Sequence, residues 1–327
     1  MTVVGNRKKP PIIFLMGPTA SGKTDLAIGL SEHLPIELVS VDSALVYKGL
    51  DIGSAKPTPE EQAQHPHRLI DICDPAVPYS VADFRRDALQ AIEEIHQAGN
   101  IPLLVGGTMM YFKVLLEGIA EMPASTTEIR EAIEQEAREK GWPAMHAQLA
   151  EVDPAMADEL HPNHSQRIAR ALEVYRLSGR TMSQWRAEQQ HQSLLEDYEV
   201  VQLALMPHKR ELLHQRIAER FRKMVDGGFE QEVRHLYGRG DLHEGLPAIR
   251  AVGYRQMWEY VEGLHSWGEM IEKGIVATRQ LAKRQLTWLR GWEALYPLYM
   301  DDSQGKLREK EEIQQEALQI LSKLTIN

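Results

Sequence analysis

An octapeptide near the start of the chain has the residue types and the spacing of a phosphate-binding loop. It reads Gly17-Pro18-Thr19-Ala20-Ser21-Gly22-Lys23-Thr24, which matches G-x-x-x-x-G-K-[ST] at every fixed position. The glycines let backbone N–H groups close around an anion, Lys23 adds a full positive charge, and the Thr24 hydroxyl is placed to ligate Mg²⁺. We therefore predict that this phosphate loop binds a polyphosphate group, although the loop alone does not specify which compound carries it.

Two further polar side chains follow apolar runs that read as strands. Asp42 ends the run Ile36–Val41, and Thr108 follows Ile101–Val105 and a pair of glycines. Because ligands of an open parallel sheet sit beyond the carboxyl ends of its strands, we expect both side chains beside the phosphate loop. Asp42 suits a Mg²⁺ ligand, a general base or a plain turn cap. Thr108 suits a helix N-cap or a donor to a phosphate oxygen that gains charge.

The elements that must position these residues alternate between strand and helix in the first third of the chain. Buried strands are predicted at Ile12–Met16, Ile36–Val41, Ile101–Val105 and, more weakly, Arg68–Ile72, and helices at Thr24–Leu34, Val81–Gln97 and Met109–Leu116. Strands separated by helices are typical of a parallel sheet with crossover connections.

The pattern changes after Gly118, where helix signals continue to about Gln192 without a convincing strand. A strand pattern returns at Val200–Leu205, and long helices follow at His208–Asp226 and Trp267–Leu295, with a charged tail after Asp301. We predict an α/β core of the P-loop NTPase type with a parallel sheet, residues 1–118 and 200–327. An all-helical insertion, residues 119–199, interrupts this core.

The composition of the chain indicates the cellular compartment in which we expect the protein. The only cysteine among 327 residues, Cys73, excludes an internal disulfide and a thiolate zinc cluster, and favours a reducing cytosol. No apolar run reaches the ~18–20 residues that span a bilayer, and the N-terminus lacks a signal-peptide cleavage site. We therefore expect a cytoplasmic protein without a membrane partner.

Charge is unevenly distributed along the chain. The net charge of −10 argues against nucleic-acid binding, but Thr278–Arg290 holds four basic residues and no acid, and His161–Arg186 holds five arginines against Glu173 alone. Helical spacing puts Arg279, Lys283, Thr287 and Arg290 within a sector of roughly 80°. Such a face suits a phosphate backbone, and a solvated basic face is the alternative.

Taken together, the motifs resemble those of bacterial tRNA dimethylallyltransferases. The phosphate loop is followed in order by Asp42–Tyr47, Gly106–Tyr111, Arg250–Arg255 and Lys283–Arg290, and the resemblance extends from about Ile12 to Trp292. It implies transfer of a dimethylallyl group from its diphosphate to the exocyclic N6 amine of the adenosine 3′-adjacent to the anticodon. The usual targets of this family are tRNAs that read codons beginning with U.

The resemblance also implies roles for the residues singled out above. The phosphate loop would hold dimethylallyl diphosphate rather than ATP, and Lys23 and Mg²⁺ would stabilise the leaving diphosphate. Asp42 would accept a proton from the attacking amine, and Thr108 would bond the diphosphate near its bridging oxygen. Either Arg220 or Arg222 would grip the diphosphate.

Contacts to tRNA follow from the same resemblance, with the insertion embracing the anticodon stem-loop of a tRNA bound to a monomer. The implied contacts are Asp42, Ser43, Ala44, Leu45, Thr108, Arg130, Gln166, Arg167, Ile168, Ala169, Arg170, Arg250, Ala251, Val252, Gly253, Tyr254, Arg255, Lys283, Arg284, Gln285, Leu286, Thr287, Trp288, Leu289 and Arg290. Many relatives carry glutamine where this chain has Leu45, so any base contact there is apolar or made by the backbone. The chain also lacks the cysteines of the zinc finger found in eukaryotic relatives.

Two alternatives share the phosphate loop. A small-molecule kinase would bind ATP and transfer its γ-phosphate to an acceptor hydroxyl. A non-catalytic RNA-binding protein would carry the loop as a vestige, although the intact Lys23, Thr24 and Asp42 argue against decay.

Overall fold

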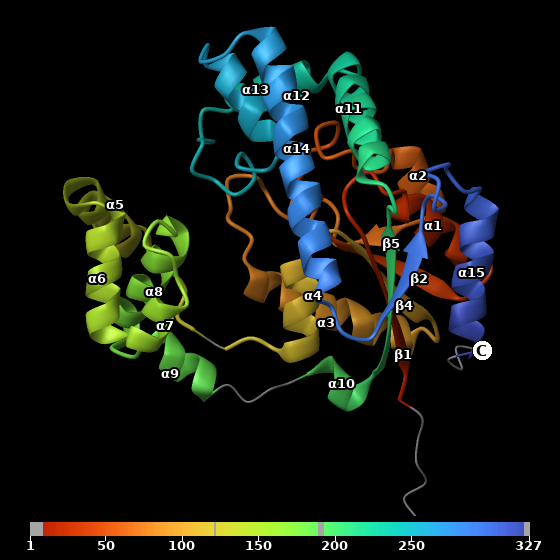
Figure 1. Ribbon diagram of the computed structural model, residues 1–327, viewed down its shortest axis with the longest axis horizontal. Coiled ribbons are helices and arrows are strands. Elements are labelled where there is room, and N and C mark those ends of the chain that lie inside the picture. The colour runs from red at the N-terminus through yellow and green to blue at the C-terminus, as the bar shows by residue number, and fades with distance from the viewer. Residues whose placement is uncertain (1–8, 121, 189–192, 324–327) are drawn as a thin grey trace, which may run out of the picture. The chain divides into compact units, whose positions relative to one another are not determined.

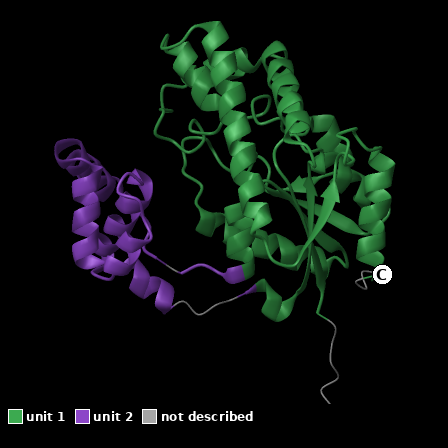
Figure 2. Cartoon of the chain, viewed as in Figure 1, with its two compact units in different colours: residues 1–116, 194–327 green, residues 117–193 purple. Residues whose placement is uncertain are grey.

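The structure is a computed structural model that describes residues 9–120, 122–188 and 193–323. It divides into two compact units: unit 1 comprises residues 1–116 and 194–327, and unit 2 comprises residues 117–193 (Figure 2). The inserted unit therefore ends before residue 199, the limit expected from sequence. The short helix α10, Leu194–Asp197, accounts for the difference, because Leu194 is buried in the core of unit 1.

Unit 1 is built around a six-stranded sheet in which every pairing is parallel, in the order β3-β2-β4-β1-β5-β6 (Figure 1). The strands are β1 Pro11–Met16, β2 Ile36–Val41, β3 His67–Arg68, β4 Ile101–Gly106, β5 Glu199–Met206 and β6 Leu295–Tyr299. The predicted α/β class with a parallel sheet is confirmed. β6 was not expected: the helix predicted at Trp267–Leu295 ends at Arg290, and Leu295 begins the strand. β6 contains Pro297 and lies at the sheet edge, where proline is tolerated.

Helices cover both faces of the sheet, so its strands are apolar on both sides. Along β1, Ile13 and Leu15 pack in the core that contains α1, Lys23–Ser31, and α15, Lys310–Lys323. The alternate residues of β1 pack instead against α3, Val81–Gln97, and α4, Met109–Glu117. This alternation is the period of two expected of a strand.

The segment after Asp301 is charged, as expected, but its helix was not predicted from the sequence. Helix α15 lies there, and it buries Ile313, Ala317 and Leu321, spaced four residues apart, against the core shared with α1. Leu318 and Ile320 add to this contact, and the other side chains of the helix are mostly polar, so the many charges of the segment concealed its apolar face.

Four helices form a separate core at the carboxyl edge of the sheet: α11 Arg210–Asp226, α12 Phe229–Gly238, α13 Tyr254–Val261 and α14 Trp267–Arg290. They pack around Val46, Tyr47 and Leu50 from the loop after β2, which also includes the short helix α2, Pro59–Gln64. No helix in the described part of the chain is long and apolar enough to cross a membrane.

Unit 2 has a core of its own and, within its described residues, contains helices and no strand. Its helices are α5 Thr127–Lys140, α6 Trp142–Val152, α7 Pro154–Asp158, α8 Ser165–Ser178 and α9 Met182–Ala187. Ile133, Leu149 and Ile168 are among the fully buried residues that join them.

Candidate active site

Three neighbouring strands end at the same edge of the sheet and position the candidate residues. Met16 and Val41 are both in register with Gly106, so the segments that follow β1, β2 and β4 begin side by side. A Cβ atom on Gly106 would lie 2.0 Å from the carbonyl oxygen of Val41, so only glycine allows this close approach. The phosphate loop, Asp42 and Thr108 therefore meet at one edge.

The backbone of the phosphate loop has a shape that depends on its glycines. Ala20 and Gly22 have φ values of 63° and 96°, in the left-handed region that glycine adopts readily. A Cβ atom on Gly17 would lie 2.7 Å from the carbonyl oxygen of Leu205 on the neighbouring strand β5. The loop then opens directly into the N-terminus of α1 at Lys23, where backbone N–H groups favour an anion.

A cavity of about 530 Å³ lies over this edge of the sheet. Its lining includes Thr19, Ala20, Lys23 and Thr24 of the phosphate loop, Asp42, Ser43, Ala44 and Leu45 after β2, Gly107 and Thr108 after β4, Arg220 from α11, and Arg284, Gln285 and Trp288 from α14. Other walls are apolar, among them Met109, Phe221 and Leu281. One cavity thus combines a phosphate-binding end with hydrocarbon surfaces.

The charges at the phosphate-binding end favour a polyanion. Burial and, to a smaller extent, the positive charge of Arg220 lower the pKa of Lys23 to about 8, against an opposing effect of Asp42. Burial also lowers the pKa of Arg220. The cavity therefore holds two incompletely compensated cations, and a bound diphosphate would supply the missing negative charge.

The structure distinguishes between the two arginines that sequence left equivalent. Arg220 lines the cavity and donates to the carbonyl oxygen of Ser54 (3.4 Å), whereas Arg222 is exposed and lies outside the cavity lining. One turn earlier on α11, Arg216 donates through Nε to the carbonyl oxygen of Ala20 (2.8 Å) and so supports the phosphate loop. Sequence reasoning missed Arg216, although its i, i+4 spacing from Arg220 puts both on one helix face.

Asp42 and Thr108 are joined through the turn after β2. Asp42 Oδ1 accepts hydrogen bonds from the N–H groups of Ala44 (2.8 Å) and Leu45 (3.3 Å), which is the turn-capping role. Thr108 Oγ1 accepts a bond from the N–H of Ser43 (3.2 Å) and keeps its own proton available to donate. One carboxylate oxygen of Asp42 thus shapes the turn, and within the described residues the other has no protein hydrogen bond.

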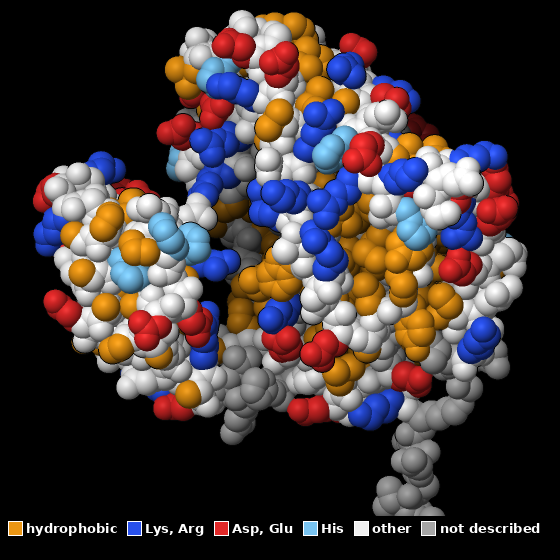
Figure 3. Space-filling model, in the orientation of Figure 1, with side chains coloured by type: hydrophobic (Ala, Val, Ile, Leu, Met, Phe, Trp, Pro, Cys, Tyr) orange, Lys and Arg blue, Asp and Glu red, His pale blue; other side chains and the backbone are white. Residues whose placement is uncertain are grey.

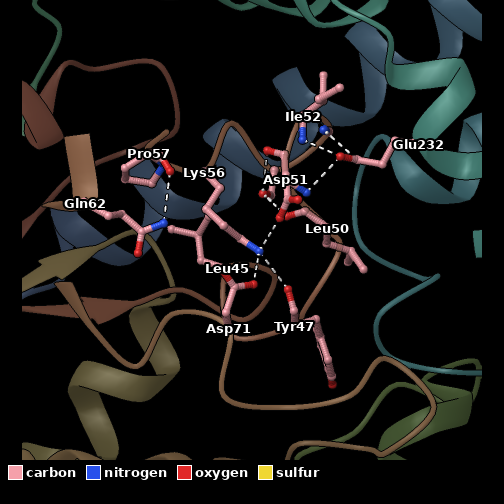
Figure 4. A network of polar contacts seen from close by, with 12 residues as sticks. Leu45, Tyr47, Leu50, Asp51, Ile52, Lys56, Pro57, Gln62, Asp71 and Glu232 are labelled. Atoms are coloured by element: carbon pink, nitrogen blue, oxygen red, sulfur yellow. Dashed lines mark hydrogen bonds and ion pairs between the residues drawn. The ribbon is translucent and has the colours of Figure 1, made fainter. Parts of the chain in front are cut away.

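The loop after β2 forms one wall of the cavity and is fixed by two ionic side chains, Lys56 and Glu232 (Figure 4). Lys56, whose side chain is only 3% exposed, pairs with Asp51 and Asp71 and donates to the carbonyl oxygen of Tyr47 (2.9 Å). Glu232 from α12 reaches the same loop. Its carboxylate accepts from three successive N–H groups, those of Asp51 (3.0 Å), Ile52 (2.6 Å) and Gly53 (3.1 Å).

Tyr254 completes the anchorage at Glu232, because its hydroxyl donates to the same carboxylate (2.5 Å). Burial and the Glu232 carboxylate both raise the pKa of Tyr254 far above its usual range, so the phenol keeps its proton. Neither Glu232 nor Lys56 was singled out from the sequence, because acids and lysines in a charged segment ordinarily read as solvated surface.

Replacing Glu232 with glutamine is expected to lower the free energy of unfolding by about 1–3 kcal/mol, because an amide NH₂ would face donors that now bond to a carboxylate, namely three backbone N–H groups and the Tyr254 hydroxyl. The matched control is Glu230→Gln on the same helix. Among the described residues its carboxylate forms an ion pair with the exposed Arg234 alone, and the change should cost under ~0.5 kcal/mol. Urea unfolding curves measure both, and equal midpoints would contradict the anchoring role.

Magnesium ligation can be tested against the side chains present. Among the described residues no cluster of three or more His, Cys, Asp and Glu side chains could hold a metal ion. Thr24 and Asp42 line the cavity together with Ser40, whose buried hydroxyl has no hydrogen-bond partner in the described part of the chain. Because Mg²⁺ takes few protein ligands and completes its shell with water and phosphate oxygens, this donor set fits an ion shared with a bound diphosphate.

The residues of unit 1 assigned to tRNA divide into an outward and an inward group. Lys283, Arg284, Thr287 and Arg290 are exposed on α14, and Figure 3 shows Lys and Arg side chains gathered over the face along which this helix runs. Arg250, Ala251 and Val252 line the cavity. The assignment needs correction for the side chains of Leu286 and Leu289, which pack into hydrophobic cores. Tyr254 and Gln285 are also buried, but both line the cavity.

The residues of unit 2 assigned to tRNA show a similar division. Gln166 and Arg167 are exposed at the start of α8, whereas the side chain of Ile168 is buried in the core and cannot contact RNA. Arg130 and Arg170 both pair with the buried carboxylate of Glu173, at 3.5 and 3.3 Å. These two arginines thus form a charged cluster whose net charge is positive.

Comparison with known proteins identifies the family. The sequence model of the family described as IPP transferase matches residues 45–292, most of the chain. The chain belongs to the IPP transferase family. The match begins after the phosphate loop, so the loop and Asp42 are assigned to the site from the geometry described above.

Solved structures of this family are similar to the chain over nearly its full length. The tRNA isopentenylpyrophosphate transferase of Bacillus halodurans is 34% identical, with 97% of each chain covered and a TM-score of 0.70. The corresponding Staphylococcus epidermidis enzyme is 31% identical, with 97% of this chain and 100% of that chain covered and a TM-score of 0.68. A eukaryotic dimethylallyltransferase acting on tRNA is 27% identical, with coverage of 89% and 74% and a TM-score of 0.74.

Proposed function

We propose that this IPP transferase moves a dimethylallyl group from dimethylallyl diphosphate to the N6 amine of the adenosine that is 3′-adjacent to the anticodon, in tRNAs that read codons beginning with U. The single observation that carries the proposal is the cavity that joins the phosphate loop, Asp42 and apolar walls beneath the cationic helix α14. The family relationship supports the same reaction, because the relatives are transferases that act on tRNA.

The reaction needs a leaving group held in place and a proton acceptor. The amine nitrogen attacks C1 of the dimethylallyl group, the allylic C–O bond breaks, and the diphosphate departs with the bonding electrons. Lys23, Arg220 and the N–H groups of the phosphate loop bind the diphosphate, and Thr108 donates to an oxygen near the breaking bond. Asp42 takes the proton released by the amine. We also propose Mg²⁺ as the cofactor: held by Thr24, it would neutralise charge on the diphosphate.

The decisive experiment measures release of diphosphate from dimethylallyl diphosphate and Mg²⁺, with and without tRNA. We expect release only when both substrates are present, together with a mass increase of one dimethylallyl group on the tRNA. Movement of label from the γ-phosphate of ATP to any acceptor would favour the kinase alternative. Binding of anticodon stem-loops without any diphosphate release would favour a non-catalytic RNA-binding protein.

We propose that tRNA binds to the exposed basic side chains of α14, and that unit 2 contacts its anticodon stem-loop. The target base must leave its stack to reach the cavity, as in other enzymes that modify a base. A cytoplasmic monomer is the form we propose, and the single cysteine of the chain suits a reducing compartment.

Changing Lys283 to alanine is expected to raise the Michaelis constant for tRNA several-fold and to reduce the slope of log affinity against log salt by about one, because one phosphate contact and its released counterion are lost. Lys273→Ala is the matched control: it makes the same substitution at an exposed position of the same helix, beyond the cavity lining. Affinity measured at several salt concentrations tests the contact, and parallel salt slopes for all three proteins would contradict it.

A further inference from the structure

The side chain of Gln285 joins two loops of the candidate site. Its Oε1 accepts a hydrogen bond from the N–H of Thr19 in the phosphate loop (2.9 Å), and its Nε2 donates to the carbonyl oxygen of Gly107 after β4 (2.9 Å). Because an N–H can only donate and a carbonyl oxygen can only accept, these partners determine the orientation of the amide. Gln285 is 7% exposed; its bond to Gly107 is buried, and its bond to Thr19 is partly buried.

The space around this amide is closely fitted. A Cβ atom on Gly107 would lie 2.4 Å from Gln285 Nε2 and 3.2 Å from the carbonyl oxygen of Gly17, so the phosphate loop, the turn after β4 and the amide are packed against one another. Few side chains could replace glutamine here. A carboxylate has no proton for Gly107, an apolar chain leaves both backbone groups unpaired, and asparagine is one carbon shorter.

We propose that Gln285 is a positioning residue for the diphosphate and does not contact tRNA. By bonding Thr19 and Gly107, it sets the separation between the N–H groups of the phosphate loop and the Thr108 hydroxyl, the two groups that hold opposite parts of the leaving diphosphate. This inference rests on the proposed function. It separates residue 285 from its basic neighbours Lys283 and Arg284, which are exposed on the same helical turn.

The test compares Gln285→Met with Gln280→Met, the same substitution at an exposed position of the same helix. Calorimetry with inorganic pyrophosphate and Mg²⁺ measures the diphosphate site, and fluorescence anisotropy with unmodified tRNA measures the RNA surface. For Gln285→Met we expect about tenfold weaker pyrophosphate binding, equivalent to about 1.4 kcal/mol, and tRNA affinity within about twofold of the parent. The Michaelis constant should rise for the prenyl donor and stay unchanged for tRNA.

A second variant keeps the test valid if Gln285→Met folds poorly. Gly107→Ala displaces the same amide from the opposite side, so it should also weaken pyrophosphate binding and raise the Michaelis constant for the prenyl donor. The affinity for tRNA should again stay within about twofold of the parent. Because both changes break the same bridge, the double variant should have nearly the same pyrophosphate affinity as the weaker-binding of the two single variants.

Each other outcome overturns a specific claim. Weakened tRNA binding with intact pyrophosphate binding would make Gln285 an RNA contact. Unchanged binding of both ligands would remove any role for the bridge. If the parent protein bound no pyrophosphate with Mg²⁺, the proposed donor site itself would fail, and the proposal for Gln285 with it.

Discussion

Replacing Asp42 with asparagine is expected to lower turnover by about 10²- to 10⁴-fold, the usual contribution of general acid–base catalysis, while donor affinity changes only a few-fold. Asparagine is the informative substitution because its Oδ1 can still accept the N–H bonds of Ala44 and Leu45 that shape the turn. The variant therefore removes the proton acceptor and retains the loop. Alanine would remove both, and its effect would combine catalysis with a displaced Leu45.

The measurement for Asp42→Asn is single-turnover transfer to tRNA, paired with calorimetric binding of pyrophosphate and Mg²⁺. Asp226→Asn provides the matched control, because it makes the same change at an exposed position at the end of α11. Transfer at the parental rate would exclude the general-base role. Loss of pyrophosphate binding in parallel with transfer would instead indicate that Asp42 acts through Mg²⁺, the alternative that sequence left open.

The strands and helices nearest the phosphate loop were predictable because local signals agree with the tertiary structure. β2 and α3 have the bounds expected from sequence: β2 is a short apolar run, and α3 begins at a capping box formed by Ser80 and Asp83. β6 was missed because the helix predicted before it extended to Leu295, and α15 was missed because its charges concealed its apolar face. The proline in β6 is acceptable because the strand lies at an edge, and the dense charges of α15 are acceptable because the helix packs through that apolar face.

The candidate site was less predictable than the fold, because a linear motif does not say which of its residues face inward. Within α14, Ala282, Gln285, Leu286 and Leu289 form one buried face, a spacing that the helical period makes visible in the sequence. Gln285 was nevertheless assigned to tRNA, because the resemblance assigned the whole segment Lys283–Arg290 without regard to which side chains face inward. The sequence did not distinguish Arg220 from Arg222, because it does not show which face of α11 points toward the site. Ile217 and Phe221, which line the cavity together with Arg220, identify that face.

Replacing Lys23 with methionine is expected to lower turnover by about 10²- to 10³-fold, the usual loss when a donor to developing negative charge is removed from a water-poor site. The same variant should bind pyrophosphate more weakly, because the diphosphate would keep Arg220 as its one charged protein partner among those proposed, beside the Thr108 hydroxyl and the backbone N–H groups. Lys223→Met, an exposed substitution of the same kind on α11, is the control. Pyrophosphate affinity equal to that of the parent would place the anion elsewhere.

The pH dependence of binding tests the same lysine independently. Burial, followed by Arg220, lowers the pKa of Lys23 to about 8 in the free protein. The ammonium form, which attracts the anion, therefore predominates below pH 8 and is lost above it. Pyrophosphate affinity should fall as pH rises through 8, by at most about tenfold per pH unit for one proton. Because pyrophosphate also titrates, the relevant quantity is the difference from Lys23→Met; Lys23→Arg, which stays charged, should show no such fall.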